Sequence, residues 1–491
     1  MKPILKIFLP AFAAMAFLSS CSGNKNVCKT NCNSGNANLT ITMYDTPPTG
    51  VTVLSFTLPI VSISLTPTTG SPQAVTTLVS SLEVTRLQTD SQLLASAAAV
   101  PAGSYTAINV TIGPTTATSN AFINSSTSTI TYGTSTCVAG AVCRLPVGAA
   151  FTVSIPLSLT LTANQNQWIG LDFNLNNAIT SSGGISVDFS QANVLKATTT
   201  ARPHTASGAV DTLDDFTGKV TAYTSDSTIS VQSAINGATT ATAAITSTTT
   251  YDDPENRCAA AVSVKACIKT GAIVSVQGIV TTTGTLTATE IDVIDSDLTA
   301  TDEVEGIVYP SLCNGAGSFG MILADTTVTS GNATLTGLSY GAGLCITPAI
   351  AATYVVDSGP LFTAVNVPTV GFQSGADIVP GQVIRAQVTN VTAASVVTAT
   401  ATRLILRWSR LSGTVNTVSG NAFTVNGLPA YLNLLTAPQV GTYPSNTMFD
   451  GITDVTGLSG LTKTVSFRAL YLNPARAANP VLLADKVRVL P

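Results

Sequence analysis

The sequence predicts an all-β protein, with an N-terminal β-sandwich followed by three tandem small β-barrel (OB-like) domains. Charged residues make up only 9% of the 491 residues, whereas globular domains usually contain about 25%. Glu and Lys, which cover most exposed helix faces, are therefore scarce. Thr, Ser, Ala, Val and Gly replace them, and β-branched Thr and Val fit a pleated sheet better than a helix. Short apolar segments separated by turn residues complete the pattern of strands.

The first 20 residues have the order of a secretory signal. Lys2 and Lys6 precede an apolar run over residues 7–17, and small residues follow. This run is too short to span a bilayer. The next five residues, Leu18-Ser19-Ser20-Cys21-Ser22, resemble a bacterial lipobox. We therefore expect residues 1–20 to be a lipoprotein signal peptide.

The lipobox resemblance implies cleavage before Cys21 and acylation of its thiol and its new amine. Several acyl chains make a stable anchor, whereas one chain holds a protein only marginally. Ser22, rather than Asp, follows the cysteine, and this favours a bacterial outer membrane. Residues 21–37 are polar and rich in Gly and Asn, as in a flexible tether.

Residues 38–200 read as a sandwich of short strands. Segments with apolar alternation are separated by turns, and a segment over residues 82–100 is compatible with a short helix or a strand. The expected strands are Leu39–Tyr44, two segments within Val51–Leu65 that are divided at Pro59, Thr106–Ile112, Thr129–Tyr132, Phe151–Leu161, Trp168–Leu175 and Ile185–Phe189. Short strands at this spacing are typical of a sandwich.

Three features of this region carry a family resemblance. They are the Asp45–Pro47 turn, the Pro101-Ala102-Gly103-Ser104-Tyr105 turn and the Leu171-Asp172-Phe173 segment. Together they resemble a domain found at the N-terminus of many bacterial lipoproteins and catalogued without an assigned function. The resemblance covers residues 38–200 and implies an anchored β-domain in the cell envelope, with no catalytic residues to transfer.

The chain repeats itself after residue 200. Each copy opens with a glycine, at Gly218, Gly306 and Gly413, and closes with an alternating strand. The period of about 90–110 residues suits tandem domains. We expect barrels over residues 208–298, 303–408 with insertions, and 410–491. The copies resemble small β-barrel domains of an uncharacterised bacterial family. The glycine permits a bend or bulge, and closure removes exposed strand edges.

Nine cysteines are present. If Cys21 carries lipid, eight remain, an even number that favours disulfides in an exported protein. Neighbours in sequence pair locally, although the connectivity stays open. The candidates are Cys28 with Cys32, Cys137 with Cys143, Cys258 with Cys267, and Cys313 with Cys345. Zinc is the alternative, but C-x₂-C is absent and the chain has one histidine.

Few motifs suggest catalysis. Residues 337–341 match G-x-S-x-G, but the sole histidine, His204, precedes the serine rather than following it. His204 is expected to be an exposed linker residue. Trp168 and Trp408 lie in expected strands, where core packing is favoured over a carbohydrate platform. A net charge of −4 disfavours nucleic acid as a partner, and no cofactor is expected.

Acidic residues gather where the first two repeats join. Asp292, Asp295, Asp297 and Asp302 are weak calcium candidates, because calcium takes several oxygen ligands. The alternative is that scarce charges lie on solvated loops, which is also the simpler interpretation of the acidic residues at 211–215 and 252–255.

These observations favour a lipid-anchored, non-enzymatic binding or structural module at the cell surface. Its expected partners are the membrane, through the N-terminal lipid, and an envelope protein or polysaccharide. The alternative hypothesis is a calcium-dependent envelope hydrolase that acts on polysaccharide.

Overall fold

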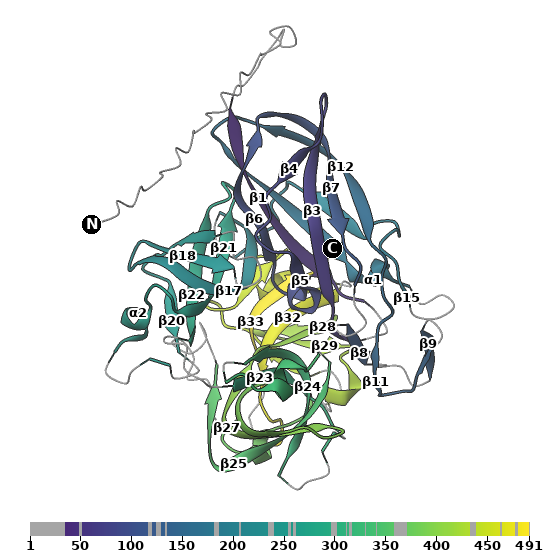
Figure 1. Ribbon diagram of the computed structural model, residues 1–491, viewed down its shortest axis with the longest axis vertical. Coiled ribbons are helices and arrows are strands. Elements are labelled where there is room, and N and C mark those ends of the chain that lie inside the picture. Colours follow the sequence, from purple (N-terminus) through teal and green to yellow (C-terminus); the bar gives the residue numbers. More distant parts are fainter. Residues whose placement is uncertain are drawn as a thin grey trace, which may run out of the picture.

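The computed structural model contains a two-sheet sandwich and three five-stranded barrels, which confirms the predicted all-β class (Figure 1). The described residues are 35–48, 52–115, 120–123, 129–132, 135–180, 186–205, 208–233, 240–253, 257–258, 262–295, 302–310, 312–313, 317–328, 330–339, 341–357, 371–432, 438–461, 464–476 and 480–490.

The sandwich is built from two main sheets. The first has the strand order β16-β13-β1-β6, and β1 runs parallel to β13. The second has the order β12-β7-β3-β4, with β5 pairing to β3. The strands are β1 (Asn36–Thr46), β3 (Thr57–Pro67), β4 (Gln73–Val75), β5 (Ser81–Glu83), β6 (Gln92–Pro101), β7 (Gly103–Ile112), β12 (Phe151–Leu161), β13 (Asn166–Asn174) and β16 (Leu195–Thr198).

Smaller elements surround these sheets. Strands β2, β8 and β11 form a three-stranded sheet. Two further pairs of short strands, β9 with β10 and β14 with β15, form two-stranded sheets. The elements are β2 (Thr52–Ser55), η1 (Val84–Gln88), β8 (Ala121–Ile123), β9 (Ile130–Tyr132), β10 (Ser135–Cys137), β11 (Val142–Arg144), α1 (Leu175–Ala178), β14 (Ile179–Thr180) and β15 (Ser186–Val187). The segment over residues 82–100, left open from sequence, contains parts of β5 and β6 and the 3₁₀ turn η1 between them.

The sandwich core holds three aromatic rings. Phe56, Phe173 and Phe189 are buried, with ring centroids 6.3–6.5 Å apart. Such spacing suits tilted and edge-to-face aromatic contacts. Phe173 of β13 thus packs against rings from two connecting segments, which help to fill the core of the sandwich.

The three barrels share one topology. In each, the first strand pairs with the second and fourth, and the fifth lies between the fourth and the third. The third strand runs parallel to the fifth, and the other pairs among these five strands are antiparallel. In barrels 1 and 3 a short additional strand, β20 or β31, also runs parallel to the fifth. Five strands closed in this way form an OB-like barrel.

The strands of each barrel follow the repeats seen in the sequence. Barrel 1 contains β17 (Ala209–Thr224), β18 (Thr228–Ser233), β19 (Thr240–Ala244), β20 (Thr250–Asp252), α2 (Val264–Cys267), β21 (Ile273–Thr281) and β22 (Leu286–Asp295). Barrel 2 contains β23 (Asp302–Val308), β24 (Phe319–Thr327), α3 (Ala333–Thr336), β25 (Gly343–Val356), η3 (Gly375–Asp377), β26 (Val383–Thr392) and β27 (Val397–Arg407). Barrel 3 contains β28 (Ser409–Ser419), β29 (Ala422–Asn426), η4 (Ala430–Leu432), β30 (Gln439–Gly441), β31 (Met448–Asp450), η5 (Val455–Leu458), β32 (Thr464–Tyr471) and β33 (Leu482–Val489).

A glycine occupies the equivalent position in the first strand of every barrel. A Cβ atom on Gly413 would lie 2.7 Å from the carbonyl oxygen of Asn426 in β29, and the equivalent contacts at Gly218 and Gly306 are closer still. The second strand therefore crosses the first at a distance that only glycine permits. This is the physical reason for the repeated glycine.

Barrel 3 lies between the other parts of the molecule. Figure 1 shows its yellow strands β32 and β33 below the sandwich, with barrel 1 at one side and barrel 2 beneath. No helix in the described part of the chain has the length and apolarity needed to cross a bilayer. The centre of the molecule is thus a junction of four domains.

Candidate functional site

Charged side chains, scarce in the sequence, are concentrated inside this junction. Many are buried, although they come from different domains. The buried charged residues include Asp90, Asp211, Glu290, Asp292, Glu303, Asp357, Arg385, Arg407, Asp450, Arg468, Asp485, Lys486 and Arg488. The expectation that acidic residues such as Asp211 and Asp292 lie on solvated loops is therefore wrong. They lie on strands whose outer faces are covered by neighbouring domains.

Arg488 of β33 links three of the four domains. It is fully buried, and its Nε donates to Oδ2 of Asp450 at 2.5 Å within barrel 3. Its Nη1 donates to the carbonyl oxygen of Asp90 at 2.8 Å in the sandwich. Its Nη2 donates to Oδ1 of Asp211 at 3.2 Å in barrel 1. The guanidinium also lies 5.1 Å from the ring centroid of Tyr44, a cation–π contact.

Asp211 of β17 is the acceptor at the centre of this contact. It accepts from the hydroxyls of Thr42 at 2.6 Å and Ser91 at 2.5 Å, both in the sandwich. Thr42 in turn accepts from Nε1 of Trp168 at 3.0 Å. Trp168 is therefore a core residue with its indole N–H satisfied, as predicted.

Asp90, from the loop before β6, is surrounded by cations of barrel 3. Its carboxylate pairs with Lys486, and Nη1 of Arg468 and Nε of Arg410 lie 3.9 and 3.7 Å away. Burial by itself would raise the pKa of Asp90, but these three cations lower it below its ordinary value. Buried carboxylates keep their charge only with such partners.

Arg468 of β32 extends the network from barrel 3 to barrel 1. It forms a two-pronged pair with Asp485, in which Nε lies 3.0 Å from both oxygens, and its Nη2 donates to Oε1 of Gln277 at 2.9 Å. Its guanidinium carbon lies 5.1 Å from the ring centroid of Trp408. Trp408, 4% exposed, is thus a core residue rather than an exposed platform.

A second set of pairs joins barrel 2 to its neighbours. Glu303 of β23 accepts from Arg257 of barrel 1 at 2.6 Å and from Arg385 of β26 at 3.0 Å. Oε1 of Glu305 lies 3.7 Å from Nη2 of Arg86 in the sandwich. Arginines from three domains, namely the sandwich, barrel 1 and barrel 2 itself, therefore converge on one strand of barrel 2.

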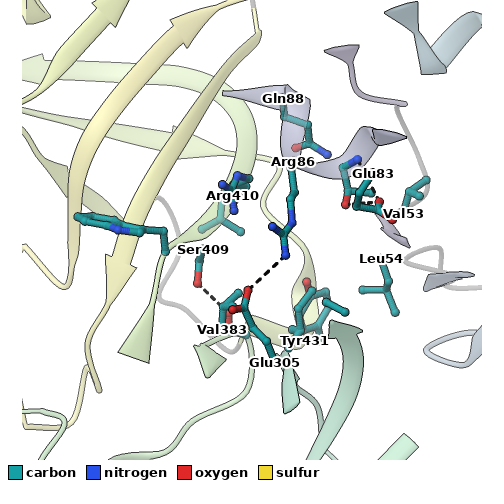
Figure 2. A pocket seen from close by; sticks show the side chains of 16 residues that line it. Val53, Leu54, Glu83, Arg86, Gln88, Glu305, Val383, Ser409, Arg410 and Tyr431 are labelled. Atoms are coloured by element: carbon teal, nitrogen blue, oxygen red, sulfur yellow. Dashed lines mark hydrogen bonds and ion pairs between the residues drawn. The ribbon is translucent and has the colours of Figure 1, made fainter. Parts of the chain in front are cut away.

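A small cavity lies beside the Arg86–Glu305 pair. Figure 2 shows side chains of the sandwich, barrel 2 and barrel 3 around it, with the Arg86–Glu305 ion pair drawn across. Its volume is about 80 Å³, well below the ~300 Å³ at which organic ligands are usually bound. It is the size of a small water cluster.

Glu290 of β22 stands apart from the paired groups. The residue is 1% exposed, and neither of its carboxylate oxygens has a hydrogen-bond partner among the described residues. Burial, followed by the nearby carboxylate of Asp357, raises its pKa well above the ordinary value, and Asp252 and Asp485 act in the same direction. Arg468 opposes the shift. The surroundings of Glu290 therefore favour the neutral form of its carboxyl group over the ionised form.

The four calcium candidates have different surroundings. Asp292 is buried on β22, while Asp302 accepts from the backbone N–H of Ser330 at 3.0 Å and from its hydroxyl. Asp297 and the side chain of Asp295 lie outside the described residues. In the described part of the chain, no three His, Cys, Asp or Glu side chains form a group able to hold a metal.

Three of the four expected cysteine pairs are disulfides in the structure. Their Cα atoms are 6.1 Å apart for Cys137–Cys143, 5.6 Å for Cys258–Cys267 and 5.4 Å for Cys313–Cys345. Cys28 and Cys32, like Cys21 of the lipobox, lie outside the described residues.

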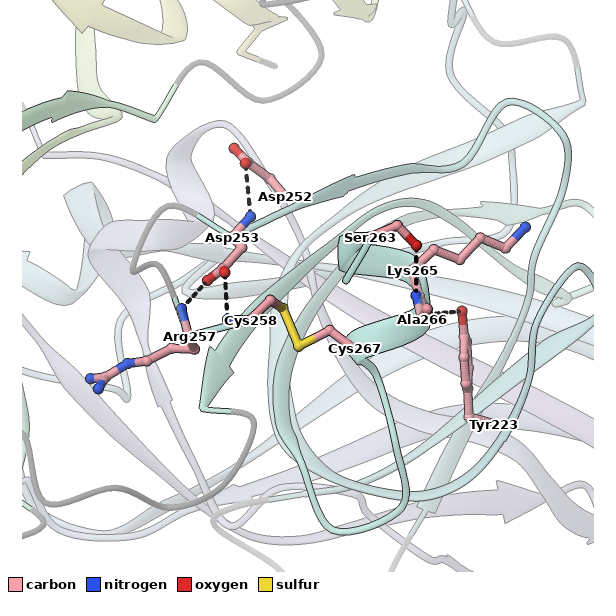
Figure 3. The surroundings of a disulfide bond; sticks show 9 residues. All are labelled: Tyr223, Asp252, Asp253, Arg257, Cys258, Ser263, Lys265, Ala266 and Cys267. Atoms are coloured by element: carbon pink, nitrogen blue, oxygen red, sulfur yellow. Dashed lines mark hydrogen bonds between the residues drawn. A yellow bond between two sulfur atoms is a disulfide. The ribbon is translucent and has the colours of Figure 1, made fainter. Parts of the chain in front are cut away.

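The loop around Cys258–Cys267 explains one acidic cluster. Figure 3 shows Asp253 facing this loop, where its carboxylate accepts from the backbone N–H groups of Arg257 and Cys258, each at 2.7 Å. The hydroxyl of Ser263 caps the short helix α2 by accepting from the N–H of Ala266 at 3.3 Å. Asp253 is thus a loop-stabilising residue.

The G-x-S-x-G segment lacks the geometry of a nucleophile elbow. It lies between helix α3 and strand β25, whereas the elbow requires a strand followed by a helix. His204, expected to be exposed, has a side chain that is only 3% exposed. Its Nε2 atom lies 3.7 Å from Oδ1 of Asp450. The two residues are neighbours because the backbone of His204 pairs with that of Asp450 at the end of β31. The expectation of an exposed linker histidine is therefore wrong.

A larger hollow lies away from the junction, at one side of the sandwich. Its volume is about 680 Å³. One wall is the first half of β12, and the other is the turn over residues 189–193 together with β16. This is a groove between the edges of the two sheets, and it is named the β12 groove below.

The sandwich domain matches a known protein family. Residues 36–188 match the family described as Domain of unknown function (DUF4382). This confirms the resemblance to a domain without assigned function. The β12 groove lies largely within the DUF4382 domain and extends just beyond its matched end. No curated protein matches the chain.

One solved structure, Drosophila Unr CSD456, aligns with 56% of this chain and 97% of its own at 11% identity. The TM-score of that alignment is 0.12, so the likeness carries no argument.

Sequence reasoning missed the basic half of the junction. Lys486 and Arg488 lie in the closing strand of the third repeat, which was interpreted only as an alternating strand. The available signal was their position, because two cations lie within a single expected strand of a chain that has few charges. In the structure every residue of β33 is buried. Charges in such a strand indicate a covered outer face with paired partners.

Proposed function

We propose that this chain is a lipid-anchored protein of the bacterial cell envelope, in the outer membrane, that acts as a non-enzymatic binding or structural module at the surface. The lipobox resemblance at Cys21 supports the address. The observation that carries the functional part is the junction, where the charged groups that catalysis commonly uses are paired with one another across domains.

The pairing suits a rigid spacer better than a reaction centre. A catalytic acid or base must face a substrate-sized pocket, but Asp90, Asp211 and Asp485 face arginines and lysine. The cavity beside them is about 80 Å³. A chain whose four domains are joined by buried ion pairs holds any surface site at a fixed distance and orientation from the sandwich domain that follows the anchor and its tether.

The address is tested by replacing the cysteine of the lipobox. The Cys21→Ala variant should be released from membranes into the soluble fraction, with Cys137→Ala as a cysteine-loss control that stays membrane-bound. A Cys21→Ala protein that remains membrane-bound after its signal is cleaved would contradict the anchor.

The molecular role is tested separately on purified protein and intact envelopes. We expect the wild-type protein to retain envelope proteins or polysaccharide in a pull-down. Activity-based labelling and calorimetric calcium titration should show neither turnover nor specific uptake. Polysaccharide turnover together with calcium uptake would overturn the proposal and favour a calcium-dependent hydrolase.

A further inference from the structure

We propose that the β12 groove binds an extended peptide segment of another protein, which adds as a strand to the free edge of β12. This inference rests on the proposed function, since it names the partner class and the place of binding. It stands on the treatment of strand edges in the described part of the chain, on the shape of the groove and on its charge.

Among the described edge strands of the two sandwich sheets, β12 is the one that is both long and left open. The barrels are closed, and the sandwich edge strands β4 and β16 are three and four residues long. The edge strand β6 packs against β17 of barrel 1, where the N–H of Ser91 donates to the carbonyl oxygen of Thr212 at 2.8 Å. In contrast, β12 has 11 residues and carries no charge, and β7 is its one pairing partner among the described residues. Long uncharged edges are templates for another strand.

The position of Pro156 shows which backbone groups are open. Proline lacks an N–H, so within a sheet its nitrogen faces away from the neighbouring strand. Pro156 pairs with Ala107 of β7, and the alternation of a strand then directs the backbone groups of Thr152 and Ser154 away from β7 as well. These groups border the groove.

The inner face of the groove is apolar. Phe151 is 41% exposed and Val153 is half-buried, although both lie on the face of β12 that carries the core residue Ile155. Phe189 and Leu195 line the opposite side. A strand added to β12 would place every second side chain over these residues. Main-chain hydrogen bonds then supply affinity, and the alternate side chains supply specificity.

The shape of the groove favours a single strand over a second copy of this chain. The edge of a sandwich consists of two sheets about 10 Å apart. If a second copy brought its β12 to this edge, its other sheet would meet the wall formed by residues 189–193 and β16. An extended peptide that adds along the outer edge of β12 has no second layer to meet this wall.

The charge of the groove indicates which peptide sequences it would bind. Lys196 is its only charged lining residue, and this side chain is exposed. We therefore expect a peptide with alternating apolar residues and an acidic residue or a carboxyl terminus at one end.

The test uses a phage-displayed library of random twelve-residue peptides, followed by affinity measurement with the selected peptides by fluorescence anisotropy. Thr152→Pro removes the open N–H, whereas the matched Thr152→Ala variant keeps it and loses only the hydroxyl. We expect selected peptides to bind Thr152→Pro at least about tenfold more weakly, and Thr152→Ala within about twofold of the wild type.

A second variant covers the case in which Thr152→Pro fails to fold. Lys196→Glu changes an exposed residue, and it should weaken peptides with acidic ends and favour basic ones. The inference is overturned if no peptide is selected, if both variants bind as the wild type does, or if Thr152→Pro instead abolishes a concentration-dependent dimer. If these tests fail while envelope components are still retained by Thr152→Pro in a pull-down, the proposed function stands and only the site is wrong.

Discussion

Arg488 and Asp211 are 277 positions apart in the sequence, yet their side chains meet at 3.2 Å in the interior of the protein. One belongs to the last strand of barrel 3 and the other to the first strand of barrel 1. Their contact also includes Ser91 of the sandwich, whose hydroxyl lies 3.1 Å from Nη2 of Arg488. The folded position of each domain is thereby coupled to the others.

Removing Arg488 should destabilise the whole assembly. The Arg488→Met variant leaves the buried carboxylates of Asp450 and Asp211 without their principal counter-charge, and loss of one partner of a buried pair costs about 3–5 kcal/mol. We expect this decrease in the free energy of unfolding by guanidinium chloride. The control is Lys265→Ala, which removes an exposed pair with Asp226 and should leave the midpoint unchanged. Equal midpoints for wild type and Arg488→Met would show that the junction contributes no stability.

The raised pKa of Glu290 should make stability fall as the pH rises. Burial raises its pKa well above 4.5, so above about pH 4.5 the unfolded chain releases a proton that the folded chain retains. The free energy of unfolding then decreases with pH up to the folded pKa. Glu290→Gln cannot ionise, and we expect it to raise the thermal midpoint at pH 7 by a few degrees and to remove this part of the pH dependence.

The matched control for Glu290→Gln is the same substitution at Glu303. Glu303 is paired with Arg257 and Arg385, so Glu303→Gln leaves two arginines without their acceptor charge and should lower the midpoint. The comparison is made by thermal unfolding between pH 4.5 and pH 8. A lower midpoint for Glu290→Gln at pH 7 would show that the Glu290 carboxylate is ionised and stabilised.

The conserved geometry of the three barrel glycines predicts a steric effect. In Gly413→Ala the new methyl group would lie 2.7 Å from the carbonyl oxygen of Asn426, and the two strands must separate. Overpacking of this kind costs about 1–3 kcal/mol. Gly103→Ala is the control, because a Cβ atom there meets no atom within 4 Å. Chemical denaturation should show a loss for the first variant alone.

The fold class could be predicted from local sequence because its signals are local. Alternation in Thr398–Leu404 or Leu39–Tyr44 identifies a strand with one buried face, and Gly218, Gly306 and Gly413 mark equivalent strands. The ambiguous segment over residues 82–100 shows the limit. Its Leu-rich and Ala-rich composition suits both states, and the pairing of β6 with β1 decides the outcome.

The junction could not be predicted because it depends on how the domains pack. Asp211 was noticed as an acidic residue, but its partner Arg488 lies two domains later in the sequence. His204 was interpreted from its loop-like neighbours, whereas its burial depends on the contact with β31. Local composition describes a residue's own strand or loop and not the domain that covers it.

The disulfides offer a further prediction, because the loops they close differ in length. Cys313–Cys345 spans 32 residues and Cys137–Cys143 spans 6. A cross-link that closes a longer loop removes more entropy from the unfolded chain, which gives about 3–4 kcal/mol for the first and about 2 kcal/mol for the second. We expect the Cys313→Ala/Cys345→Ala double variant to lose more stability than Cys137→Ala/Cys143→Ala in guanidinium unfolding without reductant. The reverse order would show that the contribution of these disulfides is set by the folded state rather than by loop closure.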